Sequence, residues 1–324
     1  MFIHLCGRDM KRWSLKLKLF ILILFPILSN LYYLQTYVSE EWKAYESAQV
    51  ENSKAQVFEN LLKFIHHVQI ERGRSALFAS GGDRQAVIQK RKEVDELGKG
   101  LSASLVGAQL KQEIQNEINE NQNQISSLRN EVDSGLVPAE IVKKYSKIIE
   151  NFFQIESQIS LNSKLTAELL GVVNLEPAKE FAGLARARGA SILKKNLPLE
   201  IEQEMVFRVL VTILQQTVDS KASTLSLDGR NKINEILKGP DWQFFRDSFS
   251  EILKKSKTGN YETNADLYFS HATQVVDGML NVFLDEFVVI KEMLKMQKEN
   301  TQKDLMIAIG RSLFFFAVFL GISF

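Results

Sequence analysis

The sequence predicts an all-α fold, built from long helices that pack as bundles. Only 5 prolines and 17 glycines interrupt its 324 residues, and this scarcity favours long helices over strands joined by tight turns. Apolar residues recur at helical spacing, and no convincing run of alternating strand residues is present. The candidate helices are 39–79, 84–97, 108–132, 139–172, 178–195, 199–222, 241–256 and 263–303.

Each boundary between these helices carries a breaking signal. In chain order the breaks are 80–83, 98–107, 133–138, 174–177, 196–198, 226–230, 239–240 and 258–260. Pro138, Pro177, Pro198 and Pro240 each lie near the start of a candidate helix, where the missing N–H of proline costs little. Antiparallel helices joined by short breaks of this kind pack naturally into up-and-down bundles.

Two apolar runs predict membrane-spanning helices. Residues 19–38 and residues 305–324 each reach the length of about twenty residues that a bilayer requires. Basic residues precede the first run and acidic residues follow it, which places residues 1–18 in the cytoplasm. Residues 39–304 then form a periplasmic domain of a two-pass protein in a bacterial inner membrane. A cleaved signal peptide is the alternative to the first span.

The second apolar run reaches the last residue of the sequence. A helix that returns to the cytoplasm should be followed by basic residues and by a domain that passes the signal on. We therefore expect a longer chain, whose cytoplasmic output module follows Phe324.

Composition and spacing argue against several other classes of protein. The formal net charge of +1 gives no field that would attract nucleic acid. Cys6 is the only cysteine and precedes the first apolar run, so the rest of the chain has no disulfide framework, no cysteine-based zinc site and no thiol nucleophile. His66 and His67 are adjacent and cannot share one helical face, which argues against a metal site. No nucleophile–base pair or carboxylate pair appears at useful spacing, so we expect neither catalysis nor a cofactor.

Two segments share the pattern R-G-x-S-x-L, at residues 72–77 and 188–193. At about 100° per residue, Arg72 falls within the apolar stripe of the first helix. In the fifth helix the same reading places Arg188 within the apolar stripe and Arg186 outside it. That second stripe consists of Phe181, Leu184, Ala185 and Ile192.

An arginine that faces apolar neighbours needs a partner, because an unpaired buried charge is strongly unfavourable. One possibility is an internal salt bridge, for which Glu71, Glu180 and Glu168 are available. The other is a small anion bound between helices, since a guanidinium is planar, always charged and presents a fork of donors. Helical phase alone leaves both possibilities open.

Longer stretches of the chain resemble a known family. Residues 68–78, VQIERGRSALF, resemble the Q-x-E-R-G-x-S-A signature of the NIT domain, the nitrate- and nitrite-sensing domain of bacterial receptors. Residues 178–187, AKEFAGLARA, resemble the K-E-x-A-G-x-E-R-A pattern of that family. Residues 145–149 are similar to its Y-x-x-I-I segment, and residues 266–273 to its late W-F-x-x-x-T stretch, with Tyr268 in place of Trp. The resemblance covers most of residues 55–290.

The resemblance implies two stacked up-and-down four-helix bundles, in which arginines of facing helices bind nitrate or nitrite. It also implies a cytoplasmic transmitter in the same chain, of chemoreceptor, kinase, cyclase or antiterminator type, and the receptor class implies a homodimer. The family pattern matches Arg186 to Arg72, whereas helical phase selects Arg188, so both stay candidates. Ala185 replaces a usual Glu, and a basic residue found after the threonine in many relatives is missing, a charge that Arg208 or Arg246 could supply. The candidate ligand residues are therefore Arg72, Arg186, Arg188, Arg246 and Thr273.

Together these features predict the sensor module of a membrane-anchored signalling receptor, possessing no enzymatic activity. Nitrate or nitrite is its expected ligand, and the lipid bilayer surrounds its expected spans. Two alternatives stay open: a helical sensor of another small ligand or partner protein, and a non-sensing membrane scaffold whose arginines are internally salt-bridged.

Overall fold

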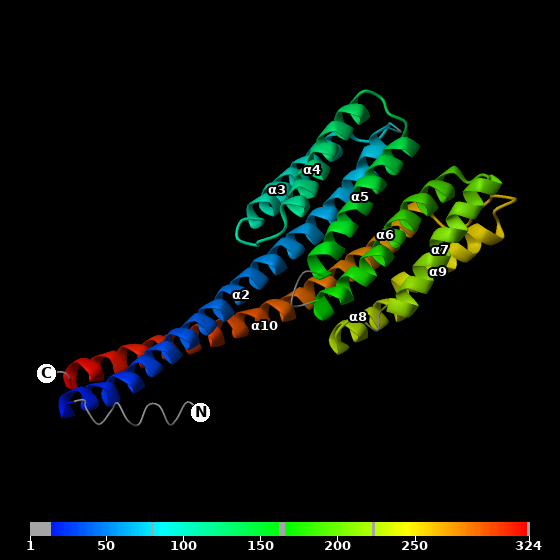
Figure 1. Cartoon of the computed structure of the whole chain (residues 1–324). Helices are drawn as coiled ribbons and strands as arrows, with labels where there is room; N and C mark the ends of the chain where they lie inside the picture. The colour runs from blue at the N-terminus through cyan, green and yellow to red at the C-terminus, as the bar shows by residue number, and fades with distance from the viewer. Residues whose placement is uncertain (1–13, 80, 162–165, 222–223, 323–324) are drawn as a thin grey trace, which may run out of the picture. The chain divides into compact units, whose positions relative to one another are not determined.

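The computed structural model describes residues 14–79, 81–161, 166–221 and 224–322, and these ranges hold helices and no strand (Figure 1). The predicted all-α class is confirmed. The helices are α2 (Leu15–Ala79), α3 (Arg84–Ser104), α4 (Gln112–Asp133), α5 (Pro138–Leu161), α6 (Thr166–Lys195), α7 (Ile201–Lys221), α8 (Leu227–Lys238), α9 (Pro240–Lys254) and α10 (Ala265–Ile322). The chain divides into two compact units, Val50–Met293 on the one hand and Met1–Gln49 with Leu294–Phe324 on the other. Helices α2 and α10 each contribute to both units.

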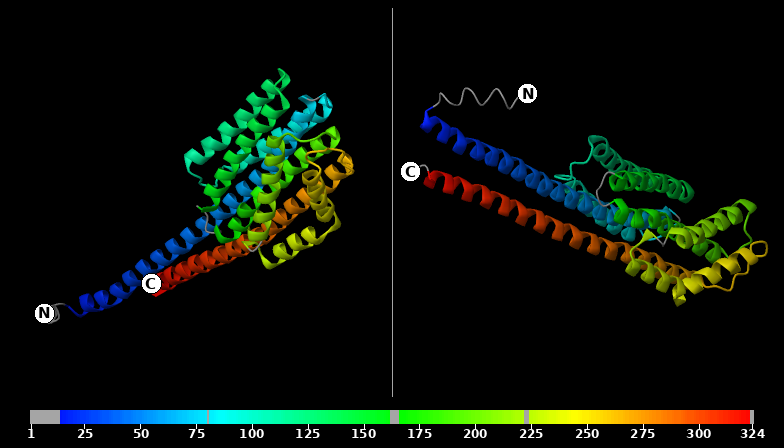
Figure 2. Two further views of the ribbon diagram at one scale, coloured as in Figure 1. Left: turned by 90° about the vertical axis from the view of Figure 1, so that its right-hand side faces the viewer. Right: turned by 60° about the horizontal axis from the view of Figure 1, so that its bottom comes forward.

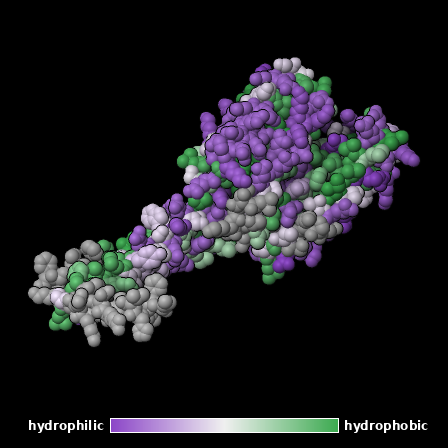
Figure 3. All heavy atoms as spheres, in the orientation of Figure 1, coloured by the Kyte–Doolittle hydropathy of each residue, from purple (hydrophilic) through white to green (hydrophobic). Residues whose placement is uncertain are grey.

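In the unit Val50–Met293, helix α2 packs with α3, α4 and α5 around an apolar core (Figures 1 and 2). Phe64 of α2 meets Phe152 of α5 edge to face, with 5.4 Å between the ring centroids. Helix α4 turns one apolar stripe at helical spacing toward this core, made of Ile114, Ile118, Ile125, Leu128 and Val132. The outward face over α3 and α4 is strongly hydrophilic (Figure 3).

The same unit holds a second group of helices, α6, α7, α9 and α10, with the short α8 against α9. Phe245 and Phe249 of α9 both pack on Tyr268 of α10. Phe207 of α7 meets Phe249 edge to face at 5.8 Å. The two groups join where α5 packs along α6, so residues of α2, α5, α6 and α10 can meet in the interior.

The helix boundary predicted at 174–177 is wrong. Helix α6 runs through this segment with Pro177 inside it, and α5 ends at Leu161 rather than at residue 172. A proline inside a helix removes one hydrogen bond and crowds the preceding turn. Tertiary packing outweighs that cost here, because Leu175 and Ala178 on either side of the proline are both buried. Pro138 and Pro240 begin α5 and α9, as predicted.

Helix α8 lies in a segment that the sequence boundaries treat as a break followed by an unassigned stretch. Ser226 caps it, because its hydroxyl oxygen accepts a hydrogen bond from the Gly229 N–H at 3.0 Å. Glu286 of α10 in turn accepts hydrogen bonds from the Ser226 N–H at 3.1 Å and from its hydroxyl at 2.5 Å. A Cβ at Gly229 would overlap the Glu286 carboxylate, so a residue that looks like a helix breaker is required here by close approach.

The other unit contains the first part of α2 and the last part of α10, which run beside each other (Figures 1 and 2). Within the described part of the chain, no helix combines the length and the apolar character needed to cross a membrane. The spans predicted at 19–38 and 305–324 are therefore not supported. Residues 1–13 of the expected cytoplasmic segment, with Cys6, and residues 323–324 lie outside the described residues.

Candidate functional site

Arg72 lies near the end of α2 and is held by two other helices. It is buried, with 4% of its surface exposed. Its Nη2 donates to Glu180 Oε2 of α6 at 3.1 Å, and its Nη1 also pairs with Glu180 Oε1, so the contact is a bidentate ion pair. Nη1 donates as well to the Ser146 hydroxyl of α5 at 2.8 Å. The internal salt bridge considered for Arg72 is therefore present, and Glu180 is its partner.

Glu71, the neighbour of Arg72 in the chain, serves a different set of contacts. It is fully buried and accepts hydrogen bonds from Arg129 Nε and Nη2 of α4, both at 2.7 Å. The Tyr145 hydroxyl of α5 also donates to Glu71 at 2.6 Å. Burial and the Glu71 charge raise the pKa of that Tyr145 hydroxyl, so it stays protonated and keeps donating. Glu71 is thus occupied by α4 and α5 and is not available to neutralise Arg72.

Arg186 of α6 is held in a different way. Its Nη1 donates to the Thr273 hydroxyl of α10 at 3.0 Å, and its guanidinium lies 5.0 Å from the centre of the Phe269 ring. The side chain is partly exposed, but its Nε is buried and has no hydrogen-bond acceptor. Among the described side chains, no carboxylate oxygen lies within 4.0 Å of this guanidinium. Arg186 is therefore a cation with neutral partners and one unused donor.

Neighbouring charges act on Arg186 from both sides. Burial lowers the pKa of its guanidinium, the negative charge of Asp277 opposes this, and the positive charge of Arg72 adds to it. The same Arg72 charge also lowers the pKa of Arg188, after burial as the larger cause. An arginine stays protonated under such conditions. Glu180 pairs directly with Arg72, and Asp277 acts on Arg186 only through space, so Arg186 has no direct ion-pair partner among the described residues.

Thr273 and Tyr268 fix the position of α10 against α6. The Thr273 hydroxyl accepts from Arg186 and donates to the Phe269 carbonyl at 2.7 Å, so it holds Arg186 in one orientation. The Tyr268 hydroxyl donates to the Ala185 carbonyl at 2.7 Å. A Cβ at Gly189 would overlap that hydroxyl, so the glycine of the second R-G-x-S-x-L segment admits the Tyr268 ring.

Comparison with known proteins supports one family. Residues 63–284 match the profile of the family described as nitrate and nitrite sensing, NIT, which is more than half of the chain. The chain belongs to the NIT family. Its fold is similar to a solved structure described as "Structure of the NasR transcription antiterminator", with a TM-score of 0.64, 16% sequence identity, and coverage of 88% of this chain and 82% of that chain. At this identity the likeness concerns the fold alone. No curated protein sequence matches the chain.

Within this NIT domain, the choice between Arg186 and Arg188 by helical phase is wrong. Arg188 is exposed, whereas Arg186 contacts α10. Between Ala178 and Gly189 the uncharged residues buried on α6 are all small, namely Ala178, Ala182, Ala185 and Gly189. Small residues let helices approach closely, but they contribute little to a stripe that is defined by large apolar side chains. The match to the family pattern selected the arginine that faces the neighbouring helix.

Arg246 and Arg208 do not join this cluster. Arg246 is exposed on α9, where its Nε lies 3.7 Å from the carboxylate of the adjacent Asp247. Arg208 is exposed on α7 and donates to Glu204 at 2.7 Å. The side chain of Glu168, the third carboxylate considered for an internal pair, lies outside the described residues. The charge expected after Thr273 is thus not supplied by either arginine.

Sequence reasoning missed Ser146, Phe269 and Asp277 as neighbours of the two arginines. Ser146 lies inside the Y-x-x-I-I segment, but nothing in that pattern marks its hydroxyl. Asp277 follows Thr273 by four residues on α10, and this spacing could have indicated that the two side chains share one face of the helix. The fold, rather than any local pattern, brings these side chains to the arginines.

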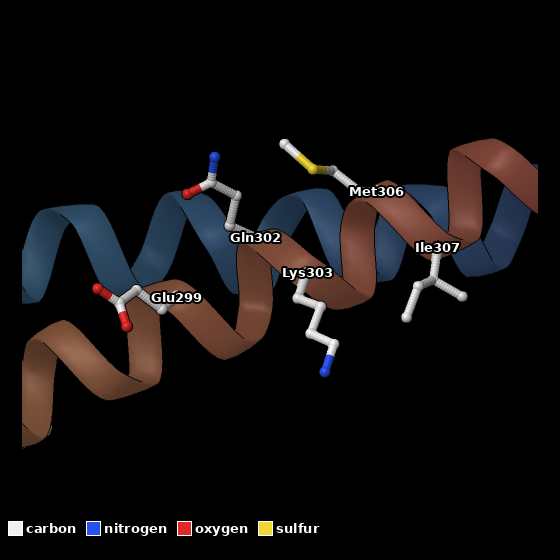
Figure 4. A pocket seen from close by; sticks show the side chains of 5 residues that line it. All are labelled: Glu299, Gln302, Lys303, Met306 and Ile307. Carbon is white, nitrogen blue, oxygen red and sulfur yellow. The ribbon is translucent and has the colours of Figure 1, made fainter.

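Neither a surface hollow nor a metal-binding group indicates a second ligand site in the described residues. A shallow hollow on α10 is lined by Glu299, Gln302, Lys303, Met306 and Ile307 (Figure 4), and none of the predicted ligand residues belongs to it. Within the described residues, no group of three or more His, Cys, Asp or Glu side chains is placed to hold a metal ion.

Proposed function

We propose that this chain is the input module of a signalling receptor, and that its NIT domain binds nitrate or nitrite at Arg186. The observation that carries the proposal is the Arg186 guanidinium, whose buried Nε has no acceptor and which lacks a carboxylate partner among the described residues. A buried donor without an acceptor is unfavourable, and a small planar anion offers both the missing acceptor and the missing negative charge.

The second arginine, Arg72, already has a carboxylate partner, Glu180. An anion that approaches from Arg186 competes with the Glu180 carboxylate for the same planar fork of donors. Ligand binding is then an exchange, in which the anion takes over part of the role of Glu180. Since α2 and α6 are joined through that pair, the exchange changes how the two helices are held together. The arrangement with Glu180 on Arg72 is the ligand-free one, and the ligand signals by preferring the other.

Calorimetric titration of the purified full chain tests this proposal. We expect heat of binding with nitrate or nitrite, and none with urea, a neutral planar molecule. Arg186→Ala should abolish the heat, and Arg186→Lys should weaken binding, since an ammonium keeps the charge but loses the fork. Arg246→Ala is the matched control and should bind as the unmodified chain does, because that side chain is exposed. Binding that persists in Arg186→Ala, or no heat with either anion, would overturn the proposal.

The Arg72–Glu180 pair by itself favours a second candidate, a scaffold whose arginines serve only internal contacts. Under that function, Arg72→Ala lowers the thermal stability, and nitrate protects neither the variant nor the unmodified chain. Under the sensor function, nitrate raises the unfolding temperature of the unmodified chain by mass action. The nitrate dependence of unfolding therefore separates the two candidates.

From the sequence alone, we also propose anchorage in a bacterial inner membrane through residues 19–38 and 305–324, a homodimer, and a cytoplasmic transmitter that follows in the same chain. We further propose that the module has no enzymatic activity. Alkaline carbonate extraction of membranes tests the anchorage. The full chain should stay in the pellet, and its release into the supernatant would contradict the proposed spans.

A further inference from the structure

A group of polar side chains lies in the interior where α2, α5 and α6 meet, apart from the contacts of Arg186. Lys179 of α6 has no exposed surface, and Glu156 of α5 and Glu176 of α6 are each 1% exposed. The Lys179 ammonium donates to Gln69 Oε1 of α2 at 2.7 Å and lies 2.9 Å from Glu176 Oε1. One cation therefore faces two buried carboxyl groups.

The hydrogen bonding of this group is incomplete. Among the described residues, Glu156 Oε1 and Glu176 Oε2 are buried without a hydrogen-bond donor, and the contact of Glu176 Oε1 with the Lys179 ammonium is an ion pair. The Gln69 Nε2 donor is buried without an acceptor as well. Two ionised carboxylates with one ammonium would leave a net negative charge in the interior, which is strongly unfavourable. A proton on one carboxyl group removes that charge and supplies a donor.

The surrounding charged groups do not replace this proton. On α2, burial and the Lys179 charge lower the pKa of His66 to about 2, so its ring is neutral. On α6, Glu180 lies one turn beyond Glu176 and adds negative charge to it. On α10, burial raises the pKa of Asp277, and the positive charges of Arg186 and Lys179 oppose this rise. Among the described residues, Lys179 is thus the cation that acts on both carboxyl groups.

The structure assigns to Glu156, Glu176 and Lys179 a buried proton-binding site, which regulates anion binding at Arg186 and to that extent rests on the proposed function. The bound proton lies on one of the two carboxyl groups, and its release leaves both of them ionised.

The bound proton is released near neutral pH. Burial raises the pKa of Glu176 to about 7, against the favourable charge of Lys179, and burial and the Glu176 charge raise the pKa of Glu156 well above its usual value. The link to the anion site passes through Glu180, which pairs with Arg72. When an anion takes Arg72, the Glu180 charge loses its partner and strengthens proton binding at Glu176. Because such coupling is reciprocal, the protonated domain binds the anion more tightly.

The proton site is tested without any ligand, by infrared difference spectroscopy of the purified full chain. A band of a protonated carboxylic acid should be present at neutral pH and disappear on titration to alkaline pH. Glu156→Gln should change or remove this band, whereas Glu150→Gln should leave it unchanged, because Glu150 is an exposed residue of the same helix paired with Lys147. Absence of the band at neutral pH, or its persistence in both Glu156→Gln and Glu176→Gln, would refute the site.

The coupling is tested by calorimetry with nitrate in buffers of different ionisation enthalpy. We expect proton uptake on nitrate binding near neutral pH, and an affinity that falls by about fivefold or more between about pH 6 and about pH 8.5. Glu176→Gln should bind nitrate with a flatter pH profile, and Glu150→Gln should keep the profile of the unmodified chain. Nitrate binding with no proton uptake would overturn the coupling. No nitrate binding at any pH would instead overturn the proposed function, and the infrared band would still decide the proton site.

Discussion

Replacing Glu180 with glutamine leaves the Arg72 guanidinium in the interior without its carboxylate. The two side chains are 5% and 9% exposed, so water can do little to screen the remaining charge. Breaking a buried ion pair by removing one partner typically costs about 3–5 kcal/mol. The Ser146 hydroxyl still accepts from Nη1, and glutamine keeps one acceptor oxygen. We therefore expect the lower end for Glu180→Gln, about 3 kcal/mol of the free energy of unfolding.

Urea unfolding followed by circular dichroism measures this loss. For a domain of this size, about 3 kcal/mol corresponds to a fall in Tm of about 6–12 °C. The double variant with Arg72→Met and Glu180→Leu replaces both charges by apolar side chains of similar length, so its loss should be much smaller than the sum of the two single losses. Nitrate at about a hundred times its Kd adds about 2.7 kcal/mol to a binding-competent chain, and should restore much of the stability of Glu180→Gln.

Two results would refute this reasoning. A loss below about 1 kcal/mol in Glu180→Gln would mean that the Arg72 charge finds water or another partner. Additive losses in the double variant would mean that the two residues act independently of each other. Protection by nitrate of the unmodified chain but not of Glu180→Gln would show that Glu180 supports the ligand site rather than competing with the ligand.

Gly189→Ala should destabilise the domain by about 1–3 kcal/mol, because the new Cβ overlaps the Tyr268 hydroxyl. Gly183→Ala, in open space on the same helix, should instead raise the thermal unfolding temperature slightly, and equal effects of the two would contradict the close contact. The raised pKa values of Glu156 and Glu176 mean that the folded chain keeps protons which the unfolded chain releases above its ordinary value of 4.5. The contribution of these two carboxyl groups to the free energy of unfolding is therefore fully present below about pH 4.5. It should decrease as the pH rises toward about 7 and beyond, by up to about 1.4 kcal/mol per pH unit for each proton. Urea midpoints across this range should flatten in Glu176→Gln, and a midpoint that rises with pH in the unmodified chain alone would reverse the assigned sign.

The sequence predicts the helical class and the inward position of the Arg72 side chain correctly for the same reason. Large apolar residues at helical spacing mark the inner face of α2, and Phe64 and Val68 of that stripe are buried beside Arg72. The prediction fails on α6, where the apolar part of the inner face around Arg186 consists of alanines and a glycine, which contribute little to a pattern of large apolar residues. Pro177 adds to the error, because a proline is normally read as a boundary and here lies inside a helix.

The partners of the buried charges could not be predicted from the sequence. Glu71 adjoins Arg72, yet it binds Arg129 and Tyr145, while Arg72 binds Glu180. Adjacent residues of a helix point about 100° apart, so each meets different neighbours. Which carboxylate reaches which guanidinium then depends on how α4, α5 and α6 are placed, which no local pattern specifies.

Helix α8 depends on α10 for its N-cap, because Glu286 of α10 holds the capping residue Ser226. Its first turn is fixed by a residue 60 positions further along the chain, through Ser226. A displacement of α10 by even a fraction of a turn would withdraw the carboxylate and leave the Ser226 N–H and hydroxyl without their acceptor. A spin label on the exposed Asn234 of α8 would then register movement of α10 without touching the helix that carries Thr273. Helix α8 therefore provides a built-in position from which ligand-driven motion in the domain can be followed.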